Sequence, residues 1–142
     1  MEEKNSIMKN ENCFSVEFYE HNGKAPARDF IKSQKIKVQA KIFRNIKLLQ
    51  EYGNFLREPN SKPLKEGIFE LRIKESGDNY RVLYFFFKDQ RIILTNGFTK
   101  KTRKTPKKEI MLALKYKKDF EGEQSWKRIL MYFLKNQCKI KN

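Results

Sequence analysis

Arginine and lysine residues stand where a β-hairpin would bring them to one face of a sheet. Arg72 lies on the polar side of an alternating stretch, and Arg81 begins the next apolar stretch after a turn. Because residues on paired strands face each other, we expect their guanidinium groups to be close neighbours. Lys100 and Lys101 follow a third stretch of this kind. Arginine binds phosphate oxygens in a bidentate manner and keeps its charge, so the arrangement predicts a phosphate clamp.

A purely structural interpretation of these cations remains open at this stage. An isolated arginine on a sheet is usually solvated or ion-paired. Glu70 and Glu75 lie close enough along the chain to pair with either arginine. Spacing alone therefore leaves two alternatives, a phosphate clamp and a set of surface ion pairs.

A phosphate clamp is nearly sufficient for one reaction, the cleavage of RNA without a metal. RNA supplies its own nucleophile, the 2′-hydroxyl, and fixed cations can orient its attack and stabilise the added negative charge. A base must take the 2′ proton, and an acid must protonate the leaving 5′ oxygen. A lysine in a strongly positive site has a lowered pKa and can serve as base, and a tyrosine can serve as acid or base.

Other catalytic residue sets are missing from the sequence. The single histidine, His21, stands beside Asn22-Gly23 in a turn-like stretch and cannot build a zinc site without further ligands. The six glycines stand singly, so no glycine-rich phosphate loop is expected. The acidic residues are scattered, which argues against a two-metal nuclease site. We therefore expect neither a metal nor an organic cofactor.

The charge of the chain favours an anionic partner, with nucleic acid the first candidate. The 142 residues fit one domain and carry a formal net charge of +15. Residues 97–118 hold nine cations and one carboxylate, so this run contributes +8 of that total. A basic run is usually a solvated helix face, but clustering at one loop-to-helix junction favours phosphate binding. The residues concerned include Arg103, Lys104, Lys107 and Lys108.

The apolar patterns predict an α+β domain. Alternating or β-branched stretches predict an antiparallel sheet of about four strands, at residues 13–18, 68–73, 80–87 and 91–98. An N-terminal helical hairpin is expected between the first two, with a short helix from Pro26 and a longer one that ends at Gly53. The inner face of the longer helix is expected to carry Ile36, Ala40, Phe43, Ile46 or Lys47, and Leu49, with Ile42 and Leu48 widening the apolar stripe.

Two helices are expected after the sheet. Thr105-Pro106 is a helix-start signal, with Thr105 as the N-cap and Pro106 at the first helical position. Gly122 is expected to interrupt the helix that follows. Apolar residues from Trp126 to Leu134 then recur at helical spacing. We expect this amphipathic helix to pack on its own domain, with a partner-binding helix as the alternative.

The chain divides into three predicted parts. Residues 1–11 form a flexible N-terminal arm, residues 12–122 the domain, and residues 123–142 a C-terminal amphipathic helix and tail. The first residues contain no signal-like apolar stretch, and no apolar run is long enough to span a bilayer. We therefore expect a cytoplasmic protein with no membrane partner.

Three sequence blocks in order carry a family resemblance. The blocks Leu64–Ile73, Tyr80–Tyr84 and Gly97–Pro106 follow the pattern LxxGϕϕELR, YRϕϕY and GFxKKTxKTP, where ϕ is a large apolar residue. Together they resemble the phage-derived HigB-like branch of the RelE superfamily of toxins (RelE/ParE-type), which belong to type II toxin–antitoxin systems. The resemblance covers roughly Phe14 to Phe120.

The resemblance implies a RelE/ParE-like α+β fold and a metal-independent endoribonuclease that cuts messenger RNA, usually on the ribosome. It also implies a heteromer with a cognate antitoxin, typically a small helix-turn-helix repressor. The catalytic positions of the family fall on Arg72, Arg81, Lys100 and Lys101, and a C-terminal tyrosine that often contributes in relatives corresponds best to Tyr116. The basic residues Arg103, Lys104, Lys107 and Lys108 would hold RNA backbone.

The sequence leaves two alternatives to this function. Where some relatives carry a lysine two positions before the first arginine, this chain has Glu70, and it has no histidine suited to act as a base. A non-enzymatic nucleic-acid-binding protein on the same fold would bind RNA or DNA without cleavage. An inactive homologue would bind only its antitoxin. A cleavage assay separates both from a ribonuclease.

Overall fold

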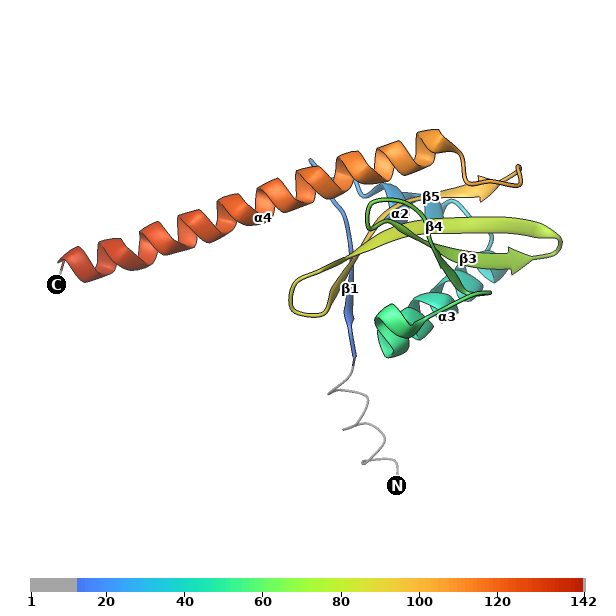
Figure 1. Ribbon diagram of the computed structural model, residues 1–142, viewed down its shortest axis with the longest axis horizontal. Helices are drawn as coiled ribbons and strands as arrows, with labels where there is room; N and C mark the ends of the chain where they lie inside the picture. Colours follow the sequence, from blue (N-terminus) through green and yellow to red (C-terminus); the bar gives the residue numbers. More distant parts are fainter. Residues whose placement is uncertain (1–12, 142) are drawn as a thin grey trace, which may run out of the picture.

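The fold is a twisted sheet with helices on both faces (Figure 1). The computed structural model describes residues 13–141 and the side chains of residues 13–137. The predicted N-terminal arm, residues 1–11, lies outside the described residues. In chain order the elements are β1 (Ser15–Phe18), α2 (Pro26–Lys32), α3 (Ile36–Tyr52), the 3-10 helix η1 (Gly53–Phe55), β2 (Ser61–Pro63), β3 (Phe69–Glu75), β4 (Asp78–Phe87), β5 (Arg91–Lys100) and α4 (Lys107–Lys141).

The sheet has five strands in the order β1-β5-β4-β3-β2, with the aromatic-rich β4 at its centre. The antiparallel pairing of β3, β4 and β5 is confirmed. The prediction of a purely antiparallel sheet of about four strands is wrong in two respects. β1 pairs with β5 in parallel, because the chain crosses one face of the sheet through two helices before the first hairpin. β2 has only three residues, too few for a visible alternation.

The turn between β3 and β4 sets the register of the two candidate arginines. Ser76 and Gly77 have φ angles of 51° and 82°, as a two-residue type I′ hairpin turn requires. Glycine adopts such an angle without a steric cost. The resulting register places Arg72 directly opposite Arg81 on the neighbouring strand.

The helices α2 and α3 cover one face of the sheet, but the predicted helical hairpin is not confirmed. α2 packs mainly against β5 and α3 mainly against β3, so each helix is held by its own strand. The inner face of α3 carries Val38, Ile42 and Leu49, whereas Ile36 and Phe43 are exposed. Ile42 and Leu49 are thus confirmed as inner-face residues. The prediction is wrong for Ile36, Ala40 and Phe43, which lie on the opposite, exposed side of the helix.

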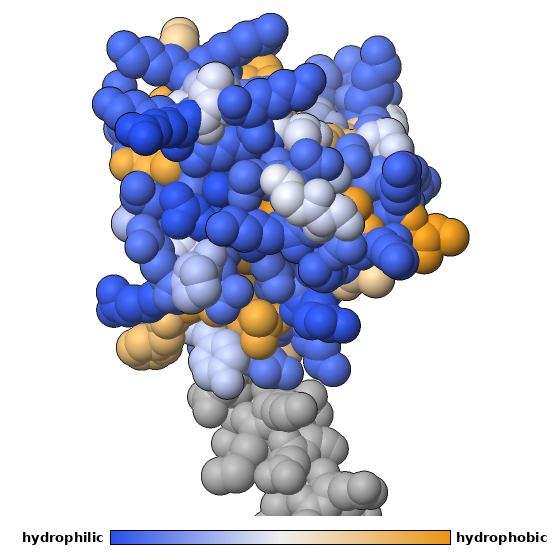
Figure 2. Space-filling model, turned by 90° about the vertical axis from the view of Figure 1, so that its right-hand side faces the viewer, coloured by the Kyte–Doolittle hydropathy of each residue, from blue (hydrophilic) through white to orange (hydrophobic). Residues whose placement is uncertain are grey.

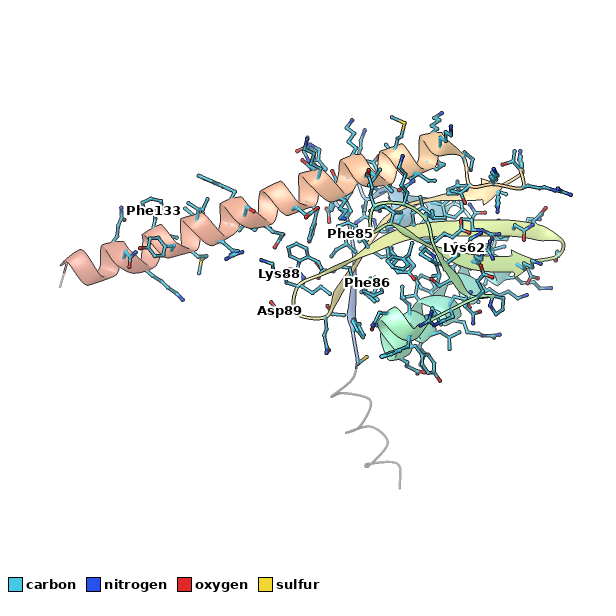
Figure 3. The ribbon with its side chains drawn as sticks, viewed as in Figure 1. Lys62, Phe85, Phe86, Lys88, Asp89 and Phe133 are labelled. Atoms are coloured by element: carbon cyan, nitrogen blue, oxygen red, sulfur yellow. The ribbon has the colours of Figure 1, made fainter. Side chains whose placement is uncertain are left out.

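α4 crosses the opposite face of the sheet as one continuous helix, so the predicted pair of C-terminal helices is wrong. A single glycine such as Gly122 costs a helix only about 1 kcal/mol and does not end it. Successive side chains of β4 point to opposite faces of the sheet. Phe85 contacts the Phe120 ring of α4, and Phe86 belongs to the core beneath α2 and α3 (Figure 3).

The second half of α4 extends beyond the sheet (Figure 1). Its apolar side chains stay exposed, with Trp126 at 61% and Phe133 at 59% of their accessible surface. The expectation that this segment packs on its own domain is therefore wrong for the structure described. Among residues 13–141, no helix combines the length and apolarity needed to cross a membrane.

Candidate functional site

A buried carboxylate holds the two candidate arginines together. Glu70 of β3 is only 1% exposed and accepts a hydrogen bond from Arg72 Nε at 2.9 Å. Arg81 Nε lies 3.5 Å from the same oxygen, Glu70 Oε2. The prediction that the guanidinium groups are neighbours agrees with this arrangement, and so does the alternative in which Glu70 pairs with both.

The loop after β5 closes over this cluster. The hydroxyl of Thr105 donates a hydrogen bond to Glu70 Oε1. The interpretation of Thr105 as the N-cap of the following helix is wrong, because its side chain points to the sheet and α4 begins only at Lys107. Thr105 thus connects the basic loop to the centre of the site.

The ionisation of this cluster follows from its contacts. Burial alone would raise the pKa of Glu70, but hydrogen bonds from Thr105 and Arg72 and the charge of Arg81 bring it below its ordinary value of 4.5. Burial lowers the pKa of Arg81. The negative charge of Glu70 opposes this shift, and the positive charge of Arg72 adds to it. An arginine so placed remains charged at neutral pH. The site therefore keeps one carboxylate between two guanidinium groups.

Arg81 still has an unused donor. Its side chain is almost fully buried, and Nη1 donates a hydrogen bond to the carbonyl oxygen of Tyr80 at 3.0 Å. Its Nε atom is buried and has no hydrogen-bond acceptor among the described residues, since the distance to Glu70 is long. Arg72 is only partly buried, and its Nη1 lies 3.9 Å from Glu58 Oε1, beyond hydrogen-bond distance. Arg72 and the part of Arg81 that lines the neighbouring cavity can donate to an incoming anion, whereas the enclosed Nε of Arg81 cannot.

Lys100, the last residue of β5, belongs to the same positive cluster. Burial lowers the pKa of Lys100, and the charge of Arg81 lowers it further. The charges of Arg72 and Lys62 act in the same direction, and only Glu70 opposes them. Lys62 stands opposite Glu70 in the register of β2 with β3 (Figure 3). We did not single out Lys62 from the sequence, because its strand is too short to show a pattern.

An open cavity of about 500 Å³ lies beside the two arginines. Half of the ten residues that line it are lysine or arginine, and none is acidic. Besides Arg72 and Arg81, its cations are Lys41 and Arg44 from α3 and Lys74 from β3. The amide of Asn45 donates a hydrogen bond to the carbonyl oxygen of Arg72 at 2.7 Å and so joins α3 to this edge of the sheet. The cavity offers room for a phosphate-bearing ligand.

The basic run continues outward from the cluster. Lys101 follows β5 directly. The exposed cations of the next loop and the first turn of α4 are Arg103, Lys104, Lys107 and Lys108. Figure 2 views this end of the molecule, which is largely hydrophilic. The exposed cations therefore adjoin the buried cluster through Lys100 and Thr105.

The structure does not bring Tyr116 to this cluster. Its ring stacks on Tyr19 with centroids 4.6 Å apart, and the two line another pocket together with His21 and Asp119. Burial and the charge of Glu109 raise the pKa of Tyr116. A role for Tyr116 in catalysis stays a prediction from the family pattern, without support from its position.

The only histidine, His21, pairs with a carboxylate on the surface. Its Nδ1 atom lies 3.5 Å from Asp119 Oδ2, which also accepts a hydrogen bond from Tyr19 at 2.7 Å. Within residues 13–137 no group of three or more acidic, cysteine or histidine side chains is arranged to hold a metal ion. The chemistry that this arrangement can support is anion binding, charge stabilisation and proton transfer by lysine.

Comparison with known proteins identifies relatives of the chain. Residues 29–118, more than half of the sequence, match the family described as phage derived protein Gp49-like (DUF891). A protein named "Probable endoribonuclease HigB1", found in two strains of Mycobacterium tuberculosis (CDC 1551 / Oshkosh and ATCC 25618 / H37Rv), is 38% identical over 85 residues. This match covers 58% of the present chain and 62% of the relative in each case. The match thus spans under two thirds of those relatives.

Proposed function

The chain belongs to the phage-derived Gp49-like family, and from this we propose that it is the toxin of a type II toxin–antitoxin system. Its activity would be that of a metal-independent endoribonuclease that cleaves messenger RNA on the ribosome. The relatives named as HigB1 endoribonucleases support the reaction class. The observation that carries the proposal is the buried carboxylate of Glu70 with Arg72 and Arg81 beside it, in a field of positive charge that also acts on Lys100.

In this mechanism, the arginines bind the scissile phosphate. Arg81 is held by burial, by Glu70 and by the Tyr80 carbonyl oxygen, so its charge and the part of its guanidinium group that lines the cavity are fixed before RNA arrives. Fixed donors stabilise the extra negative charge of the pentacoordinate phosphorus without reorganisation. Arg72, which is less buried, reaches the cavity where the substrate would enter.

Lys100 and Lys101 would transfer the protons. Lys100, whose pKa is lowered, would take the proton of the 2′-hydroxyl as that oxygen bonds to phosphorus. The bond from phosphorus to the 5′ oxygen then breaks, and protonated Lys101 would supply the proton to that oxygen. The products are a 2′,3′-cyclic phosphate and a 5′-hydroxyl, so no metal, water or cofactor enters the first step.

The exposed basic residues would extend the contact along the RNA. Arg103, Lys104, Lys107 and Lys108 are placed to neutralise backbone phosphates beyond the scissile one. Arg44 of α3 would do the same on the side of the cavity. A helix-turn-helix antitoxin would silence the toxin by covering this positive surface, and the cell compartment would be the cytoplasm.

The test is expression of the chain in a bacterial host, followed by primer-extension mapping of messages. We expect growth arrest and new 5′ ends within translated messages, both lost in Arg81→Ala. Arg81→Lys keeps the charge but not the planar fork, so we expect it to restore only part of the cleavage. Arrest without new 5′ ends would contradict the proposed reaction.

One observation favours a second candidate, a nucleic-acid-binding protein without cleavage. Glu70 neutralises part of the cluster and occupies the Nε donor of Arg72. Such a protein would bind RNA with an affinity that falls steeply with salt and would leave the RNA intact. Intact RNA after prolonged incubation with ribosomes and the purified protein would favour this candidate.

A further inference from the structure

We propose that the outer face of α3 binds an acidic amphipathic helix of a partner protein. Ile36, Ala40 and Phe43 form this outer face and lie on the side of α3 that is turned away from the sheet. Residues at positions i, i+4 and i+7 share one side of a helix, so the three side chains make one apolar stripe. Ile36 is 83% and Phe43 51% exposed. α3 lies at the outside of the fold, on the face of the sheet opposite α4 (Figure 1).

The charges around the stripe indicate the chemistry of the partner. Residues 32–47 hold six lysine or arginine residues and no carboxylate. At about 3.6 residues per turn, Lys37 and Arg44 follow one edge of the stripe, whereas Gln39 lies on the other edge. A partner that lies along the stripe therefore needs acidic residues on the edge that meets Lys37 and Arg44.

The apolar stripe favours a protein partner over RNA or a lipid surface. An RNA backbone would use the cations, but Ile36 has neither a hydrogen-bonding group nor an aromatic ring on which a base stacks. Binding to a lipid surface scales with the apolar area that it buries, and one alanine with two large side chains offers little. A helix with apolar residues at the same spacing covers the stripe and brings its acidic edge to the cations.

The outer face adjoins the candidate site. Arg44 also lines the cavity beside Arg72 and Arg81. A bound helix would therefore place carboxylates at one wall of that cavity, where they would compete with phosphate. Only this consequence for catalysis rests on the proposed function, because the binding of the helix requires no RNA.

The experiment titrates the full chain with a fluorescent synthetic peptide and follows its anisotropy. The peptide has 17 residues, the length of α3, with leucines at i, i+4 and i+7 and glutamates along one edge. We expect saturable binding with a Kd on the order of 10 μM at low salt. A peptide with glutamine in place of each glutamate should bind at least about tenfold more weakly. Phe43→Glu should weaken binding by a similar factor and remain folded, because Phe43 lies outside both cores.

Met111→Glu is the matched control. Met111 is 69% exposed on α4, on the opposite face of the sheet, so its substitution adds the same charge at a distance from α3. It should bind the peptide as the unchanged chain does. No binding by the unchanged chain, or an equal loss in both variants, would overturn the proposal.

The nature of the partner is tested with the same two variants. Equal binding of the glutamine peptide would overturn the proposal, and so would poly-uridine RNA or anionic lipid vesicles that bind this face in place of the peptide. Peptide binding by a chain that cleaves no message would support this inference and contradict the proposed ribonuclease.

Discussion

Two arginine–glutamate clusters at opposite ends of β5 differ in how completely their charges are satisfied. At the start of the strand, Arg91 donates two hydrogen bonds to Glu17, at 2.6 and 2.8 Å. Its guanidinium carbon also lies 5.3 Å from the centre of the Phe87 ring and 5.4 Å from that of Phe120. At the other end, Arg72 and Arg81 share the single carboxylate of Glu70, and their charges act on nearby Lys100.

The difference separates a structural cation from a functional one. Arg91 has a bidentate partner and two aromatic neighbours, so it ties β1, β5 and α4 together and has little left to offer a ligand. The Glu70 cluster keeps net positive charge and an unused buried donor on Arg81. An excess of fixed cations over carboxylates is unfavourable for folding alone but suits a site that awaits an anion.

Apart from Arg81, the largest effect is expected at Lys100. Lys100→Ala should lower the rate of RNA cleavage about 100-fold, the range found for loss of a general base. Because the neutral amine is the base, the rate should rise with pH and level off above the pKa of Lys100. That pKa lies below the ordinary lysine value of 10.5. Single-turnover cleavage across a pH series measures both effects.

Lys100→Arg is the control for this prediction. It preserves the positive charge but provides no base near neutral pH. If Lys100→Arg cleaved as fast as the unchanged protein, Lys100 would serve only as a cation.

A stability change is expected at Glu70. In Glu70→Gln, the arginines lose their counter-charge, and the free energy of unfolding at neutral pH should fall by roughly 2 kcal/mol. The pKa of Glu70 is lowered by folding, so its stabilisation is complete above pH 4.5 and disappears as pH falls through the lower folded value. Urea unfolding from neutral to acidic pH should therefore show a weaker acid sensitivity in Glu70→Gln. Identical pH profiles would contradict this role.

A smaller loss of stability is expected at the opposite cluster. Arg91→Ala removes two hydrogen bonds to a carboxylate and the contacts with two rings, which together stabilise the fold by about 1–2 kcal/mol. Thermal unfolding would measure this loss. Cleavage per folded molecule should stay the same. An equal loss of cleavage would show that Arg91 contributes to the reaction and not only to the stability of the fold.

The smallest effects are expected in the exposed loop. Arg103→Ala and Lys104→Ala should each weaken RNA binding a few-fold and reduce the slope of log affinity against log salt by about 1. Filter binding at several salt concentrations measures this slope. An unchanged slope in the double variant would mean that the loop does not contact the RNA backbone.

The sequence predicts the hairpin strands β3, β4 and β5 because short alternating stretches and the Ser76-Gly77 turn determine their local pairing. That is why Arg72 and Arg81 were correctly expected to be neighbours. The sequence does not predict the parallel pairing of β1 or the short strand β2. The position of Thr105 depends on the path of an irregular loop. The position of Lys62 depends on a strand that is too short to show alternating apolar and polar residues. Neither has a local signal. The continuity of α4 through Gly122 was missed because one glycine costs less than the neighbouring residues contribute to the helix.

The central claim is that Arg81 acts on RNA whereas Arg91 acts on the fold. The most direct test is the single-turnover rate of message cleavage on ribosomes by purified Arg81→Ala and Arg91→Ala, each at a temperature where both are folded. We predict a loss of about 100- to 1,000-fold for Arg81→Ala and a change within about twofold for Arg91→Ala. Equal rates for the two variants would contradict the account.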